Sequence, residues 1–361
     1  MDTILIVFAC GTIRSTAVST EWDCSVSALD IEQSDALIAY LRPRNAHVES
    51  VRVLPGGVSS RAVYVRLTDG REWVLKQSLA ELRVAVDWFS DPQRIHNEAR
   101  ALRWLSQLTP PGSVPEFIFE DVEAHVLAMS AIPQPHENWK TRMLSGRLDA
   151  AHAEAFGALL RTIHRGAAAH VETLRAEFGL GFFESLRIEP YYRYTASQVD
   201  QARDFLHDLI ADMLAQSLTL VHGDYSPKNI LIYQDRPVLL DHEVAHVGDP
   251  AFDVGFGMTH LLSKAHHLSA QRTAFADAAR RCWTAYAGAL GDAGWTDLEA
   301  RAARHTLACL LARVAGRSPL EYLTPDERAQ QRAAVLRLMA HPPDKMGSLI
   351  EQFITELERQ G

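Results

Sequence analysis

The stretch that decides the fold is residues 220–256, LVHGDYSPKNILIYQDRPVLLDHEVAHVGDPAFDVGF. Three apolar runs in and beside it predict short strands: 218–222, 230–233 and 238–240. Asp224 follows the first run, Asn229 opens the second and Asp241 ends the third. A hairpin that turns at Gln234-Asp235 would bring Asn229 and Asp241 side by side, with the Asp224 carboxylate nearby.

These three side chains suit phosphoryl transfer. Mg²⁺ prefers oxygen ligands and usually keeps substrate phosphates in its shell, so Asn229 and Asp241 are candidate metal ligands. Asp224 can accept the proton of an attacking hydroxyl and orient it, which makes it the candidate catalytic base. An Asp, an Asn five positions later and a further Asp at a strand end form the layout of kinase-like enzymes.

The N-terminal half supplies nucleotide-binding candidates in a suitable order. Strands are predicted at 51–54, 62–67 and 72–76, with an Asp69-Gly70 hairpin turn before the third. Lys76 ends that strand and is placed to reach the phosphates, while Glu98, on a helix predicted up to Thr109, can hold Lys76 by an ion pair. Small residues between the first two strands let the backbone approach phosphates closely, and our candidates there are Gly56, Gly57, Ser59 and Ser60.

The chain changes character near residue 132. Before it the pattern is mostly strands with one long helix, and after it the pattern is mainly helical. Met129, Ser130 and Ala131 fall at the connection, where backbone groups can bind an adenine edge. We therefore expect an α+β fold with a nucleotide-binding N-lobe over 28–132 and a catalytic, acceptor-binding C-lobe over 133–361.

The combined motifs resemble the aminoglycoside phosphotransferase/choline kinase-like family, which has a protein-kinase-like fold. The likeness rests on His222-Gly223-Asp224 with Asn229, on Asp241-His242-Glu243, and on Gly248-Asp249-Pro250 with Asp253, and it covers roughly residues 50–325. It implies ATP and Mg²⁺ as cofactors and transfer of the γ-phosphoryl group to a small-molecule hydroxyl, in an aminoglycoside, amino alcohol or sugar. It assigns the base to Asp224, the metal to Asn229 and Asp241, and the phosphates to Lys76.

The acceptor is the open part of the prediction. The sequence departs from the family pattern at His242, at Lys228 and in its short glycine loop, and these departures concern the substrate. Two segments are candidate edges of an acceptor site or, equally, packing between the lobes: one runs from Phe182-Phe183 to Tyr191-Tyr192-Arg193, the other comprises Gly316-Arg317-Ser318-Pro319 with Tyr322. Glu137 and Trp139 are further candidates.

Several polar residues are expected to have structural roles. His222 should bond to the backbone near Asp224, and His164 should be a core histidine with satisfied partners. Asp249 and Asp253 should cap a helix or brace the loop around Asp224. Glu243 can support the metal or hold a loop.

The bulk composition narrows the function classes. With 36 Lys and Arg against 45 Asp and Glu, the formal charge of -9 argues against nucleic-acid binding. The four unpaired cysteines favour a reduced, cytoplasmic protein. The apolar run at 4–10 is too short to span a membrane, and residues 1–27 are expected to be a peripheral strand or a disordered extension, with a lipoprotein-like signal as the alternative.

Two rival functions are kept. A protein kinase is disfavoured because no long activation segment separates Asp241 from Gly248. An inactive nucleotide-binding scaffold is disfavoured because such proteins usually lose the base, a metal ligand or the lysine, and all are present here.

Overall fold

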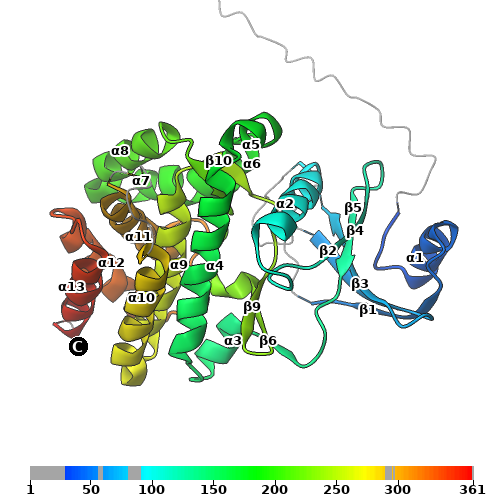
Figure 1. Cartoon of the computed structure of the whole chain (residues 1–361). Coiled ribbons are helices and arrows are strands. Elements are labelled where there is room, and N and C mark those ends of the chain that lie inside the picture. Colours follow the sequence, from blue (N-terminus) through cyan, green and yellow to red (C-terminus); the bar gives the residue numbers. More distant parts are fainter. Residues whose placement is uncertain (1–28, 56–59, 80–90, 289–294, 296, 360–361) are drawn as a thin grey trace, which may run out of the picture.

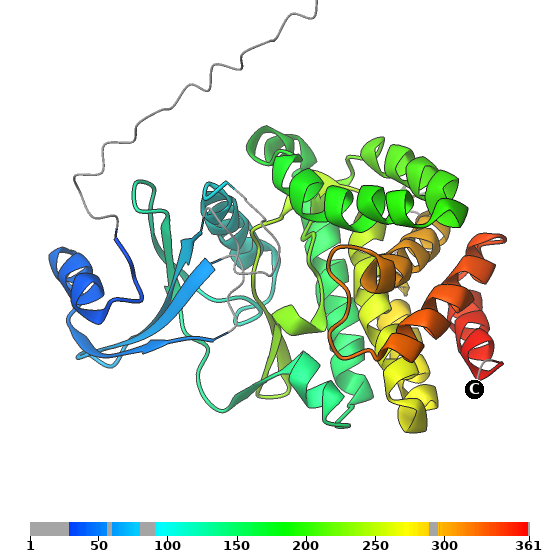
Figure 2. The same ribbon diagram turned by 180° about the vertical axis from the view of Figure 1, so that it is seen from behind.

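A computed structural model describes residues 29–55, 60–79, 91–288, 295 and 297–359. A five-stranded sheet with two helices forms one part of the molecule, and a larger, mainly helical part lies beside it (Figures 1 and 2). The predicted 1–27 extension lies outside the described residues, as do Gly56, Gly57 and Ser59.

The sheet is antiparallel throughout, in the order β1-β2-β3-β5-β4. Its strands are β1 (Val48–Val53), β2 (Ser60–Leu67), β3 (Glu72–Ser78), β4 (Phe117–Asp121) and β5 (Val126–Ser130). The predicted turn before β3 is present, and Gly70 supplies its positive φ of 88°.

Alternation along β3 decides which side chains face which helix. Trp73 and Leu75 belong to a core shared with α1 (Ser34–Leu41). Val74 packs instead against the core that contains α2 (Arg94–Leu108). Because side chains alternate with period two, Lys76 points to the α2 side with Val74.

The helical part is built around α9 (Pro250–His267), which is buried along nearly its whole length. It packs among α4 (Ala150–Ala168), α10 (Arg272–Ala287) and α11 (Leu298–Ala315) (Figure 1). Further helices surround this core: α3 (Trp139–Leu144), α5 (Val171–Glu177), α6 (Gly181–Phe183), the π-helix η2 (Glu184–Arg193), α7 (Tyr194–Gln198), α8 (Arg203–Leu214), α12 (Pro325–Met339) and α13 (Met346–Glu358). Asp149 caps α4 as predicted, accepting a hydrogen bond from the Ala151 amide.

Two small sheets carry the stretch that decided the fold. One is β6-β8-β9 (His136–Asn138, Ile230–Tyr233 and Arg236–Leu239), and the other is β7-β10 (Thr219–Val221 and His246–Gly248). Gln234 and Asp235 have φ values of 49° and 57°, as a two-residue hairpin requires. The Leu240 amide donates to the Asn229 carbonyl at 2.9 Å, so the predicted hairpin does bring Asn229 next to Asp241.

The structure differs from the predicted elements in detail. β6 and β10 were not predicted, since three-residue strands carry too little alternation to recognise. The predicted strand at 238–240 begins two residues earlier, at Arg236. In the described part of the chain, no helix is both long and apolar enough to cross a bilayer.

Candidate active site

Lys76 joins the two parts of the molecule. From β3 its Nζ lies 2.7 Å from Glu98 Oε2 on α2 and 2.8 Å from Asp241 Oδ1 in the segment after β9. Burial would lower the pKa of Lys76, but the carboxylates of Asp241 and Glu98 outweigh it and hold that pKa above its ordinary value. Lys76 is therefore a cation at neutral pH, held between two carboxylates.

Helix α2 is attached to the same segment by two further residues. The Arg94 Nε lies 3.1 Å from Glu243 Oε2, inside the protein. Asn97 Nδ2 donates to the carbonyls of Glu243 and Ala245 at 3.0 and 2.8 Å. These contacts fix Glu98 and Asp241 on either side of Lys76.

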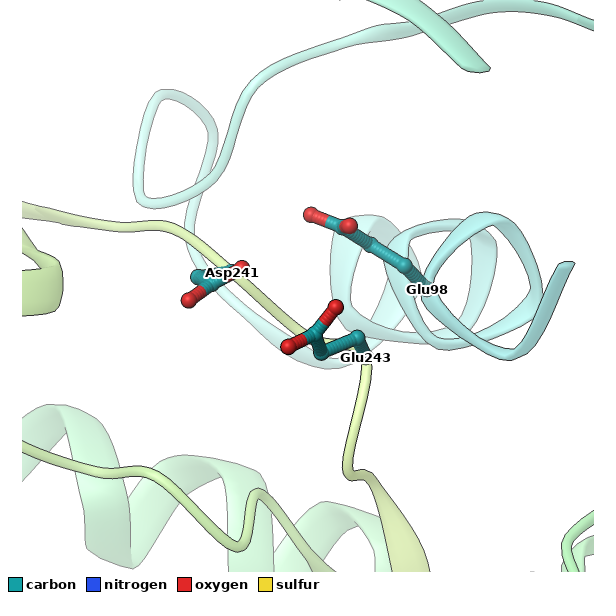
Figure 3. A group of neighbouring side chains, drawn as sticks. All are labelled: Glu98, Asp241 and Glu243. Carbon is teal, nitrogen blue, oxygen red and sulfur yellow. The ribbon is translucent and has the colours of Figure 1, made fainter. Parts of the chain in front are cut away.

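Three carboxylates face a common space at this point. Ligand oxygens of Glu98, Asp241 and Glu243 all lie within 4.8 Å of one another. Figure 3 shows Glu98 entering from α2, while Asp241 and Glu243 come from one extended segment. Of the two roles left open for Glu243, its ion pair with Arg94 supports the role of holding the segment against α2.

Asp241 has an unusual backbone. Its φ is 66°, in the left-handed region that few residues other than glycine adopt. Such conformations persist where the surrounding structure imposes them, and they gather at functional sites. Although burial opposes ionisation, Lys76 first and Lys228 next lower the pKa of Asp241, so it is a carboxylate at neutral pH.

The contacts of Asp224 converge on one of its two carboxylate oxygens. Oδ2 lies 2.8 Å from Asn229 Nδ2, 3.0 Å from Lys228 Nζ and 3.1 Å from Arg187 Nη2. In the described residues Oδ1 has no such partner. Burial would raise the pKa of Asp224, but Arg187 and Lys228 outweigh it and lower that pKa. The group is an ionised carboxylate with one oxygen left to accept a proton.

A buried network braces the loop that carries Asp224. Asp253 accepts hydrogen bonds from the amides of His222 and Gly223, at 2.6 and 2.9 Å. The His222 Nδ1 accepts from the Asp224 amide at 3.2 Å, as predicted for a backbone-bonding histidine. Gly223 has a φ of 76°, and a Cβ there would lie 2.9 Å from the Val244 carbonyl oxygen. Glycine is thus required directly before Asp224.

The other structural expectations are also met. His164 is fully buried, with its ring nitrogens 2.9 Å from the Tyr286 hydroxyl and 3.2 Å from Asp253 Oδ2. Asp249 caps α9 by accepting a hydrogen bond from the Ala251 amide.

Sequence reasoning missed Arg187. The predicted acceptor edge around it was argued from its aromatic residues and from Arg193, which instead pairs on the surface with Glu184 at 2.8 Å. Arg187 lies in η2 and reaches Asp224, and its Nε also donates to the Gly223 carbonyl at 2.7 Å. The one sequence signal for Arg187 was its position inside the predicted acceptor edge, because a π-helix gives no recognisable period in a sequence.

The first predicted acceptor edge is largely interior, whereas Arg317 and Pro319 of the second are exposed. Phe183, Tyr192 and Trp139 are buried in the main core, which supports the packing alternative for them. Glu137 pairs with Arg142 and Arg147 at 2.9 Å.

The adenine candidates lie at the end of β5. Met129 is buried, and the amides of Ser130 and Ala131 donate to the carbonyls of Glu116 and Glu72 at 2.9 Å. An adenine edge at this segment would therefore have to use its carbonyl oxygens. Ser60 begins β2 and is buried, and its hydroxyl has no hydrogen-bond partner among the described residues.

The donor set at Asn229 and Asp241 fits Mg²⁺. The Nδ2 of Asn229 donates to Asp224, so its side-chain oxygen remains available as a ligand. One neutral amide oxygen and one carboxylate are the kinds of protein ligand that Mg²⁺ takes in nucleotide sites, where substrate phosphates complete its shell.

The architecture and the site define the class of protein. A small sheet joined to a helical part through a lysine–carboxylate bridge is a kinase-like arrangement. The structure resembles amicoumacin kinase hAmiN, solved in complex with AMP-PNP, Ca²⁺ and Ami, with a TM-score of 0.58, 14% identity, and 86% of this chain and 95% of that one covered. It also resembles a candidate fructosamine-3-kinase from Thermobifida fusca, with a TM-score of 0.51, 20% identity, and 84% and 98% covered. At these identities the likeness shows the protein-kinase-like, two-lobed α+β fold.

The sequence itself settles the family. Residues 50–289, more than half of the chain, match the phosphotransferase enzyme family, and the chain belongs to it. Among curated proteins it is 25% identical over 228 residues to methylthioribose kinase 2 of Oryza sativa subsp. japonica, which covers 55% of this chain and 53% of that protein. The chain thus spans about half the length of the curated relatives it matches.

Proposed function

We propose that this protein is an ATP- and Mg²⁺-dependent phosphotransferase that moves the γ-phosphoryl group to a hydroxyl of a small molecule. The observation that carries the proposal is the pairing of two arrangements across the lobes. In the first arrangement, Lys76 lies between the carboxylates of Glu98 and Asp241. In the second, the Asn229 side chain donates a hydrogen bond to Asp224, while the Asn229 carbonyl accepts one from Leu240, the residue before Asp241. Both are parts of a phosphoryl-transfer site.

On the nucleotide side, Lys76 would bind the phosphates and Glu98 would hold it. The loop at Gly56, Gly57, Ser59 and Ser60 would cover the phosphates, and residues 129–131 would meet the adenine. The similar amicoumacin kinase was solved with an ATP analogue and a divalent cation, which supports a nucleotide and a metal here. Held by Asn229 and Asp241, Mg²⁺ would neutralise phosphate charge as it develops.

On the acceptor side, Asp224 would orient the attacking hydroxyl and take its proton on Oδ1. A bond forms between that hydroxyl oxygen and the γ-phosphorus as the bond to the β-phosphate oxygen breaks, and ADP leaves. Arg187 and Lys228 hold Oδ2, so the carboxylate is fixed in one orientation. Most of the rate would come from positioning and charge neutralisation.

The proposal includes the division into a nucleotide-binding lobe over 28–132 and a catalytic and acceptor-binding lobe over 133–361. It also places the enzyme in the cytoplasm, where ATP and Mg²⁺ are supplied. Sugars, amino alcohols and aminoglycosides are the starting acceptor classes, and a methylthioribose kinase among the relatives supports a sugar.

Nucleotide binding tests this proposal before any acceptor is known. Thermal unfolding is followed with AMP-PNP, with and without Mg²⁺, for the wild type and for Asp241→Asn. At about 100 times Kd, the nucleotide should stabilise the wild type by about 2.7 kcal/mol. The Mg²⁺-dependent part of that shift should vanish in Asp241→Asn. No nucleotide shift in the wild type would overturn the proposal.

A further inference from the structure

The two candidate acceptor edges meet at a pair of buried cations. Tyr191 of η2 and Ser318 both contact Arg313 of α11, and Tyr322 contacts Lys264 of α9. We call Lys264 and Arg313 the basic pair. Neither residue has a role in the proposed phosphotransfer steps.

Arg313 is buried with no carboxylate partner among the described residues. Its hydrogen bonds in the described structure all come from one nitrogen, Nη1, which donates to the Tyr191 hydroxyl at 2.9 Å and to the Ser318 hydroxyl and carbonyl. Its Nε is buried and has no hydrogen-bond partner among the described residues. The guanidinium thus keeps part of its five-donor fork unused.

Lys264 is fully buried. In the described structure Lys264 makes one hydrogen bond, in which Nζ donates to the His260 carbonyl of its own helix at 3.2 Å. This single bond compensates only weakly for the loss of hydration of the buried ammonium group. Nζ also lies 5.3 Å from the centre of the Tyr322 ring. Burial, followed by the charges of Lys140 and Arg313, lowers the pKa of Lys264 to about 7. A buried lysine without a paired anion lowers protein stability. Such a cost is typical of a functional site, where a bound ligand supplies the missing negative charge.

The basic pair is continuous with the candidate catalytic centre. Arg187, which contacts Asp224, lies 5.8 Å from the centre of the Tyr191 ring, and Arg313 lies 5.7 Å from the same centre. The Tyr191 ring is therefore close both to the cation that contacts Asp224 and to one member of the basic pair.

Helix α9 gives a second connection. Phe256, His260 and Lys264 are spaced by four residues and share one face of α9. Arg187 lies 5.9 Å from the centre of the Phe256 ring at one end of that row. Lys264 lies at the other end, so the row leads from the Asp224 contact to the basic pair.

The local charges do not balance. Asp224 already pairs with Arg187 and Lys228, and Glu321 pairs with Lys140. In the described structure neither Lys264 nor Arg313 has a carboxylate within ion-pair distance. Glu321 acts on both through its charge but is already paired with Lys140, so positive charges outnumber negative ones around the basic pair. A cationic acceptor would be repelled there, and an anion would be bound.

We propose that the acceptor carries a carboxylate or phosphate group, which Lys264 and Arg313 bind while its hydroxyl lies at Asp224. This inference rests on the proposed phosphotransferase function. It separates the protein from kinases of cationic amino alcohols and aminoglycosides.

The test is a panel of matched hydroxyl compounds with ADP release as the readout. Glycerol, glycerate and glycerol 3-phosphate form one series, ribose and ribose 5-phosphate a second, and ethanolamine and kanamycin are the cations. Glycerate against glycerol 3-phosphate distinguishes a carboxylate from a phosphate. An anionic member should exceed its neutral counterpart about 100-fold in kcat/KM, the size expected of two charge-assisted contacts.

Two variants assign that preference to the basic pair. Lys264→Met and Arg313→Gln should each raise KM for the anionic acceptor about 10-fold or more, leave kcat within a few-fold, and leave the neutral counterpart unchanged. Arg332→Gln, which removes an exposed cation from α12, is the matched control. A purely structural role would change all acceptors together.

Each outcome decides the question. Preference for a neutral or cationic acceptor, or an anionic preference that survives both substitutions, overturns this inference and leaves the phosphotransferase proposal standing. If nothing in the panel is phosphorylated and AMP-PNP gives no stabilisation, the proposed function fails and the inference fails with it. If AMP-PNP binds but no acceptor, anionic or other, is phosphorylated, the inactive scaffold is favoured and the inference is again overturned.

Discussion

The two oxygens of the Asp224 carboxylate have different surroundings, and this asymmetry suits the proposed role of the residue as the base. Three donors hold Oδ2, which fixes the orientation of the group. Two of them are cations, so the carboxylate stays ionised at neutral pH. A base of this kind contributes by position more than by proton affinity, as a loose phosphoryl-transfer transition state requires.

Lys264 gives a prediction at the same scale. Its pKa is about 7 in the folded protein and close to 10.5 when unfolded, so between those values the unfolded chain binds more protons and stability rises with pH. The destabilisation caused by the buried charge of Lys264 is therefore complete below about pH 7 and disappears as the pH approaches 10.5. Each unit of difference corresponds to about 1.4 kcal/mol.

Lys264→Met removes that charge and keeps an unbranched side chain that is only one atom shorter. We expect it to raise the thermal unfolding midpoint by several degrees at pH 6 and much less at pH 9.5. The measurement is unfolding followed by circular dichroism at both values, with Arg332→Gln as the control for loss of a cation. If Lys264→Met were no more stable than the wild type at pH 6, Lys264 would have a partner that compensates its charge.

At the scale of elements, the close contact between α4 and α10 depends on one missing Cβ. A Cβ at Gly157 would lie 2.1 Å from the Cys282 carbonyl oxygen, which belongs to the backbone of α10 and has no flexible end to move. A Cβ at Gly347 on α13 would meet nothing within 4 Å. The two glycines form a matched pair of helical positions.

Gly157→Ala should destabilise the fold by about 1–3 kcal/mol or more, because the two helices must separate. Gly347→Ala should be neutral or should stabilise by up to about 1 kcal/mol, because alanine is the better helix former. Urea unfolding of both variants measures the difference. A Gly157→Ala variant as stable as the Gly347→Ala variant would contradict the packing described here.

The elements also show how far sequence alone reaches. The β8–β9 hairpin was predictable, because two apolar runs flank a two-residue turn and its register then places Asn229 beside Asp241. The Lys76–Glu98 pair was predictable because strand and helix periodicity set both side chains on facing surfaces. The positions of Arg187, Arg313 and Lys264 were not predictable. These residues come together through the packing of η2, α9 and α11, and a local sequence pattern does not indicate how helices pack.

At the scale of the whole molecule, polar contacts at the centre of the candidate site join the two lobes, and others join them elsewhere, such as Trp104 with Glu177 and Leu239 with Ser113. The bridge from Lys76 to Asp241 and the contacts of Arg94 and Asn97 with residues 243–245 connect the sheet part to the segment after β9. Lys76, Glu98 and Asp241, which would bind nucleotide and metal, are thus among the groups that connect the lobes. We expect nucleotide binding and lobe arrangement to depend on each other.

The most direct test of the central claim is transfer of the labelled γ-phosphoryl group of ATP to the best acceptor of the panel, by the wild type and by Asp224→Asn, in single-turnover experiments. Asn keeps the shape of the side chain and the nucleotide site but cannot take the proton. For Asp224→Asn we expect nucleotide-induced stabilisation close to the wild-type value and a transfer rate lower by about 100-fold or more. A transfer rate in Asp224→Asn close to that of the wild type would contradict it.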